Sequence, residues 1–165
     1  MNEDWNCLGE ESKDPYSQVC IEAVENDKIF NNFKKDPRYT AILEHVSIEQ
    51  GKLYAEDILD YDIDSDLISS FKENDIVGGS SIFNFGEPFG RISPSTLRYI
   101  QNALDISYFF GEGELNKIVE IGGGYGGLCK TINCLCDFGE YHIYDMEAAS
   151  KSVSYTHLTL PTTDR

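Results

Sequence analysis

The sequence is short of basic residues and of long apolar runs. Its 165 residues include 13 Lys and Arg against 29 Asp and Glu, which gives a formal charge of −16 at pH 7. This acidic excess repels phosphate backbones and anionic lipid headgroups, so we expect neither nucleic-acid nor membrane partners. No stretch approaches the roughly 20 consecutive apolar residues that cross a bilayer. The N-terminus is acidic where a secretory signal is basic and then apolar.

The cysteines also lack a recognisable pattern. Five are present, an odd number without the spacing of a secreted disulfide framework, which favours free thiols in a cytoplasmic protein. Cys129, Cys134 and Cys136 contain no C-x-x-C pair. We therefore expect no metal site and interpret these cysteines as small apolar side chains.

Charge and composition vary along the chain. Residues 1–75 hold 7 basic and 19 acidic residues, whereas residues 76–152 hold 5 and 9. We interpret this acidic excess as solvated surface without chemistry.

Residues 153–165 are rich in Thr and resemble the read-through translation of a sequencing adapter joined in frame to a shortened gene. We expect native sequence to end near residue 152, leaving an N-terminal fragment that is poorly stable and inactive alone.

The front of the chain carries helix-start signals. Asp14 and Asp36 each precede a proline, which suits an N-cap followed by the first helical residue. Apolar spacing predicts that the first helix runs to Phe33 and the second to Val46. Three more helices are predicted: one opened by a capping box at Ser47 and Gln50 and running to Leu59, one over 67–71, and one from Ser93-Pro94 to Gly111.

The pattern changes after residue 75. Residues 76–92 are rich in Gly, Ser and Phe and predict an ordered connector. KIVEI, a glycine turn, a helix over 128–136 and YHIYD then predict the start of a parallel α/β sheet with a right-handed crossover. The predicted units are an acidic helical region (1–75), a connector with a helix (76–116), the start of a Rossmann-like domain (117–152) and the foreign tail (153–165).

The glycine turn carries the functional signal, and it fits two fingerprints. Gly122, Gly124 and Gly127 match G-x-G-x-x-G, which binds dinucleotides. Glu120, Gly122, Gly124 and Gly126 match E-x-G-x-G-x-G, which suits S-adenosylmethionine. A carboxylate at the strand end repels a diphosphate and tolerates a sulfonium and an ammonium. The charge therefore favours the methyl donor over a nicotinamide cofactor.

Asp145 ends the second predicted strand, 23 residues after Gly122. An acidic residue at this place accepts hydrogen bonds from ribose hydroxyls, which both cofactors contain. The alternative interpretation is an N-cap for a helix beginning at Met146 or Glu147. Three classes stay open: a methyltransferase, an NAD-dependent oxidoreductase, and a partner-binding domain without catalysis.

Four segments together resemble a bacterial family of sugar O-methyltransferases. They are YTAILEHVSIEQGKLY, FGEPFGRISPSTLRYI, IVEIGGGYGGL and YHIYD, which extend from about Tyr39 to Asp145. The resemblance implies a class I methyltransferase fold behind a helical N-terminal region, with transfer of a methyl group from S-adenosylmethionine to a sugar hydroxyl. It implies that these residues contact the cofactor: Glu120, Gly122, Gly123, Gly124, Gly126 and Asp145.

The sequence indicates the residues that bind the saccharide less clearly than those that bind the cofactor. His45, flanked by acidic residues, is the best candidate for contact with the acceptor or for a base. Arg98, on the helix before the first strand, is a second substrate candidate. The usual interpretation of both is a solvated surface residue. The catalytic base, the sugar and the oligomeric state are not assigned.

Overall fold

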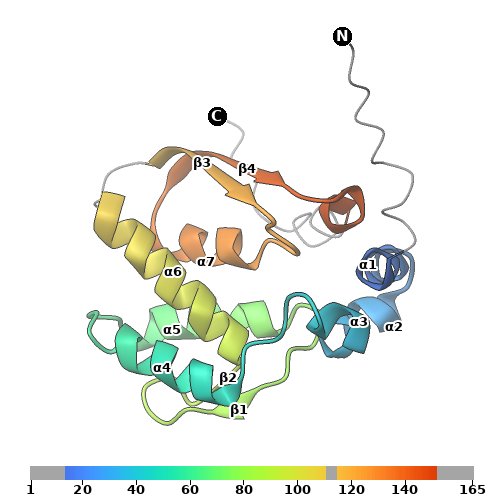
Figure 1. Cartoon of the computed structure of the whole chain (residues 1–165). Coiled ribbons are helices and arrows are strands. Elements are labelled where there is room, and N and C mark those ends of the chain that lie inside the picture. Colours follow the sequence, from blue (N-terminus) through green and yellow to red (C-terminus); the bar gives the residue numbers. More distant parts are fainter. Residues whose placement is uncertain (1–13, 111–114, 152–165) are drawn as a thin grey trace.

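A computed structural model of the chain describes residues 14–110 and 115–151 as a mixed α/β fold (Figure 1). Residues 147–151 are helical. The predicted foreign tail, 153–165, lies outside the described residues. The other elements, in chain order, are α1 (Pro15–Glu25), α2 (Asp27–Phe30), η2 (Phe33–Lys35), α3 (Pro37–Thr40), α4 (Ile48–Ile58), α5 (Ser65–Lys72), η3 (Glu73–Asp75), β1 (Phe83–Asn84), β2 (Arg91–Ile92), α6 (Pro94–Phe110), β3 (Leu115–Ile121), α7 (Gly127–Leu135) and β4 (Phe138–Tyr144).

The first predicted helix start is confirmed, but its predicted end is wrong. Asp14 caps α1 by accepting from the backbone N–H of Ser17 at 2.9 Å. The helix ends before Asn26, whose extended backbone and side-chain bond to the N–H of Lys28 begin α2 as a new helix. A second cap inside the apolar pattern therefore prevents one continuous helix as far as Phe33.

The second helix is also shorter than its apolar spacing predicts. Asp36 caps α3 as expected, accepting from the N–H of Arg38 at 2.9 Å, but α3 ends at Thr40 and not near Val46. Beyond Thr40 the apolar residues do not share one buried face, because Ile42 is 52% exposed. With no continuous face to bury, packing does not support a longer helix.

The capping box before α4 is confirmed. The Ser47 hydroxyl accepts from the Gln50 N–H at 3.2 Å, and the Gln50 side chain accepts from the Ser47 N–H at 2.9 Å. Both bonds satisfy N–H groups that the first turn of a helix leaves without intrahelical partners. Helices α5 and α6 also occur where they are predicted.

Ser47→Ala is expected to lower the free energy of unfolding by about 1 kcal/mol, because the substitution removes an N-cap acceptor. Chemical denaturation of the protein checks this value. Ser69→Ala, in the exposed middle of α5, is the control and is expected to change stability by less than about 0.5 kcal/mol. Equal losses in the two variants would contradict the role of the cap.

Helix α6 lies between two layers (Figure 1). It packs on α4 and α5 on one side and on α7 on the other. The η3 turn ties both layers together: Asn74 donates to the Gly127 carbonyl and the Thr131 hydroxyl, and Asp75 accepts from the Ser93 N–H. The predicted connector 76–92 is ordered and contains the short antiparallel pair β1–β2.

Strands β3 and β4 are parallel, with Ile118 opposite Tyr141 and Glu120 opposite Ile143. This confirms the predicted order of strand, glycine turn, helix and parallel strand, although β4 begins at Phe138, earlier than the predicted YHIYD. Two apolar side chains of β3 are largely exposed, Val119 at 54% and Ile121 at 85%. Among the described helices, none is long and apolar enough to span a membrane.

Candidate functional site

The glycine turn connects the end of β3 to the start of α7. Gly122, Gly124 and Gly126 adopt positive φ angles of 76°, 57° and 84°. L-residues with a Cβ are disfavoured in this conformation, so the turn requires glycine at these places. A Cβ on Gly122 would meet nothing within 4 Å, whereas Gly123 faces the side chains of Ile143 and Glu120. Gly122 therefore leaves space for close approach to the backbone.

Glu120 projects toward the turn from the penultimate position of β3. Its carboxylate accepts a hydrogen bond from the Tyr141 hydroxyl at 2.9 Å. Burial raises the pKa of Glu120, the Tyr141 bond opposes this rise, and the negative charge of Asp145 adds to it. Glu120 takes no part in the ion pairs among the described residues. A half-buried carboxylate without a cationic partner favours a positively charged ligand.

Asp145 follows β4 and reaches across to the glycine turn. Its Oδ2 accepts from the Gly124 N–H at 2.7 Å, and its Oδ1 accepts from the Met146 N–H at 2.7 Å. The structure therefore brings Asp145 and the glycine turn together, as the sequence predicts. Each carboxylate oxygen has a second lone pair, so these bonds leave acceptor capacity for a ligand hydroxyl.

Residues 39–43, which run from α3 into the segment after it, cover part of the glycine turn, which the sequence does not predict. A Cβ on Gly124 would lie 2.7 Å from Leu43 Cδ1 and 3.8 Å from the Tyr39 hydroxyl. Tyr39 is 1% exposed. The predicted N-terminal region therefore contributes side chains directly to the candidate site. No local signal reveals this contact, because it joins residues that are far apart in the sequence.

A buried lysine lies behind the turn and is a second feature that the sequence does not predict. Lys34 is 1% exposed, and its Nζ lies 3.7 Å from the centre of the Tyr125 ring. The amine donates to the Asn74 carbonyl at 2.9 Å and to the Ser80 hydroxyl at 3.2 Å. Burial lowers the pKa of Lys34 to about 8, and Glu44 opposes this change.

The two substrate candidates, Arg98 and His45, lie in different surroundings. Arg98 is partly buried on α6, and its guanidinium carbon lies 5.3 Å from the centre of the Tyr99 ring. Tyr99 in turn packs against Tyr125 of the glycine turn, with ring centres 6.1 Å apart. His45 is exposed, two residues after Leu43. Arg98 therefore reaches the turn through packed rings, and His45 lies on the surface near the covering segment.

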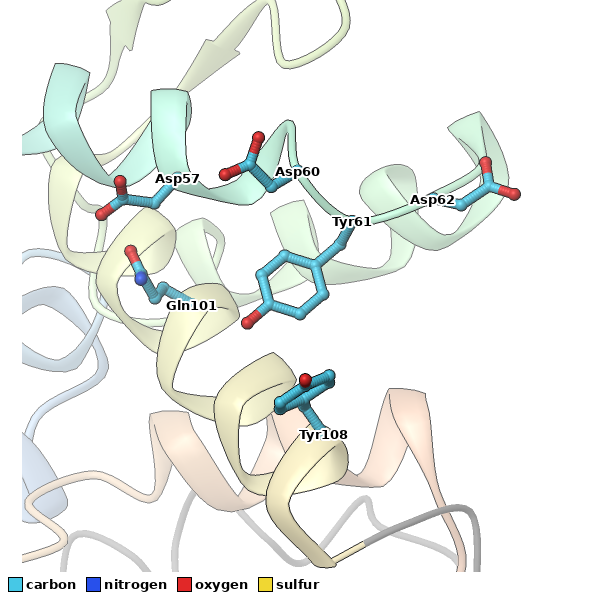
Figure 2. A pocket seen from close by; sticks show the side chains of 6 residues that line it. All are labelled: Asp57, Asp60, Tyr61, Asp62, Gln101 and Tyr108. Atoms are coloured by element: carbon cyan, nitrogen blue, oxygen red, sulfur yellow. The ribbon is translucent and has the colours of Figure 1, made fainter.

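An acidic groove of about 710 Å³ lies elsewhere, between the end of α4 and α6 (Figure 2). The Tyr61 hydroxyl donates to Asp105 at 2.8 Å on α6. The groove is lined by Asp57, Asp60, Tyr61, Asp62, Gln101 and Tyr108. Residues 14–110 and 115–151 hold no group of three or more His, Cys, Asp or Glu arranged for a metal ion.

Comparisons of the chain with protein-family models, curated proteins and solved structures find no match. The candidate site is therefore defined by its own geometry: a glycine turn with an open side at Gly122, flanked by Glu120 and Asp145. This arrangement suits a ligand that carries positive charge and hydroxyl groups able to donate hydrogen bonds.

Proposed function

We propose that this chain forms part of an S-adenosylmethionine-dependent O-methyltransferase with a Rossmann-like class I fold. The observation that carries the proposal is Glu120, a half-buried carboxylate beside a glycine turn and outside the ion pairs of the described residues. A cationic ligand relieves the cost of burying this charge, whereas a diphosphate is repelled by it.

The other residues of the site have compatible roles. Glu120 attracts the cationic end of the methyl donor, the open side of Gly122 admits close approach, and Asp145 accepts from the ribose hydroxyls. When bound, S-adenosylmethionine supplies a methyl group on a positively charged sulfur. Transfer to a hydroxyl requires an in-line approach and removal of the hydroxyl proton.

The proposed acceptor is a sugar hydroxyl, a choice supported by the resemblance of residues 39–145 to sugar O-methyltransferases. His45 and Arg98 are the proposed acceptor contacts. His45 follows the segment that covers the turn, and Arg98 contacts the turn through Tyr99 and Tyr125. A saccharide is a neutral or anionic partner that an arginine and an imidazole are able to bind by hydrogen bonds.

The proposal is tested by ligand-induced thermal stabilisation of the protein with its full native sequence. S-adenosylmethionine and its demethylated product, S-adenosylhomocysteine, are expected to raise the melting temperature, and NAD is not. A ligand at 100 times its Kd stabilises the folded state by about 2.7 kcal/mol. Stabilisation by NAD alone would favour an oxidoreductase, and no response to any of the three would favour a partner-binding domain.

Glu120→Gln is expected to weaken S-adenosylmethionine about tenfold, because a charge-assisted contact is lost while the shape of the side chain is kept. Isothermal titration calorimetry measures the change. Glu140→Gln is the matched control, since Glu140 is an exposed carboxylate on β4 that pairs with Lys117. If both variants weakened binding equally, overall charge and not the position of Glu120 would be responsible.

A further inference from the structure

Tyr141 contacts Glu120 from the neighbouring strand of the sheet. Its hydroxyl donates to the Glu120 Oε2 atom at 2.9 Å. Glu120 pairs with Ile143 in the parallel register of β3 and β4, and Tyr141 lies two residues before Ile143. Side chains two residues apart on a strand point to the same face of the sheet. The strand register therefore places the Tyr141 hydroxyl on the face that carries Glu120.

The Glu120 carboxylate lies directly against the glycine turn. A Cβ on Gly123 would lie 3.1 Å from Glu120 Oε2 and 3.2 Å from Glu120 Cδ. Among the described residues, the other oxygen, Oε1, accepts no hydrogen bond and is not one of the buried side-chain atoms that lack a partner. Tyr141 therefore bonds one oxygen of the carboxylate and leaves the lone pairs of the other oxygen for a ligand.

The other groups around Glu120 do not favour its charge. Burial raises the pKa of Glu120, the bond from Tyr141 lowers it, and the negative charge of Asp145 raises it further. Tyr99 on α6 and Cys129 on α7 also interact with Glu120, and burial raises the pKa of each to about 12. Both are therefore neutral at neutral and mildly acidic pH. Within the described part of the chain, the Tyr141 hydroxyl is the group that stabilises the ionised form of Glu120.

We propose that Tyr141 is a positioning residue whose hydroxyl holds Glu120 at the glycine turn as an ionised carboxylate, so that the site binds the cationic methyl donor at neutral and mildly acidic pH. This inference rests on the proposed function. Without the hydroxyl, Glu120 takes up a proton at higher pH, because burial and Asp145 act unopposed. A protonated Glu120 does not attract a cation, so affinity falls as the pH is lowered, and it falls earlier in a variant that lacks the hydroxyl.

The test measures the Kd for S-adenosylmethionine at two pH values by isothermal titration calorimetry, using the protein with its full native sequence. Tyr141→Phe removes the hydroxyl and keeps the ring. Its Kd is expected to exceed that of wild type by less than about threefold at about pH 7.5 and by about tenfold at about pH 5. Tyr144→Phe is the matched control, because Tyr144 is an exposed residue of β4 at an odd spacing from Tyr141 and so points to the opposite face. It is expected to follow wild type at both pH values.

Glu120→Gln provides a second control, because its side chain carries no charge at either pH. Adding Tyr141→Phe to Glu120→Gln is expected to leave the pH dependence of the Kd unchanged, whereas a purely structural role of Tyr141 would act in both backgrounds. A ratio of Kd values between Tyr141→Phe and wild type that is the same at both pH values overturns the role of Tyr141 and leaves the proposed function intact. If the wild-type protein binds no S-adenosylmethionine, the proposed function fails, and the inference fails with it.

Discussion

Gly124→Ala is expected to lower the free energy of unfolding by about 3 kcal/mol, of which about 1–2 kcal/mol comes from placing a Cβ in the left-handed conformation. The rest comes from overpacking, because the new methyl group would lie 2.7 Å from Leu43 Cδ1. Chemical denaturation measures the change. The loss would show that the N-terminal segment and the glycine turn form one packed unit.

Gly122→Ala is the matched control for Gly124→Ala. Gly122 has a similar positive φ of 76°, but its Cβ direction is open. The expected loss is therefore the conformational cost alone, about 1–2 kcal/mol. Leu43→Ala, combined with Gly124→Ala, is expected to recover part of the overpacking cost in a double-mutant cycle. Equal losses at Gly122 and Gly124, with no coupling to Leu43, would contradict the contact.

The two substitutions are also expected to differ in ligand binding. Under the proposed function, a methyl group at Gly122 occupies the open side of the turn and weakens S-adenosylmethionine, whereas one at Gly124 points away toward Leu43. The comparison separates close approach of a ligand from packing of the protein. Both roles are typical of glycines in nucleotide-binding turns.

The predictable parts of the fold depend on short-range signals. Asp14, Asp36 and Ser47 each cap a helix through a bond that spans at most three residues, so the sequence alone identifies them. The strand and glycine turn around Glu120 are also identified locally. The helix ends are not predictable from such local signals, because Asn26 begins a new helix inside an apolar pattern. Apolar spacing does not show whether neighbouring side chains share one buried face.

The candidate site likewise combines residues that local sequence signals identify with residues that only tertiary contacts bring to it. Glu120 and Asp145 follow from their places at the ends of two strands, and the structure brings both to the glycine turn. Lys34, Tyr39 and Leu43 join the site through contacts between distant segments. Lysine is rarely buried, and only the tertiary structure shows that Lys34 is. Its burial has a consequence for stability that can be measured.

The stability of the protein is expected to depend on pH through Lys34. Its pKa falls from 10.5 when unfolded to about 8 when folded, because burial disfavours the charged amine. Between these values the unfolded state binds more protons than the folded state, so stability rises with pH across this window. Below pH 8 both states are protonated and the full penalty is present. The difference in pKa corresponds to about 3 kcal/mol.

Lys34→Met isolates this contribution. Burial also raises the pKa of Cys20 to about 11 and of Cys129 to about 12. These two shifts make stability fall as the pH rises over a range that overlaps that of Lys34. The stabilities of wild type and variant are therefore compared at each pH. Lys34→Met leaves the partners of the amine unsatisfied, but it carries no charge to bury. Its stability relative to wild type is expected to fall by about 3 kcal/mol between pH 8 and pH 10.5. Lys35→Met, at the exposed neighbouring position, is expected to show no such trend. A difference between Lys34→Met and wild type that is equally independent of pH would place Lys34 in solvent.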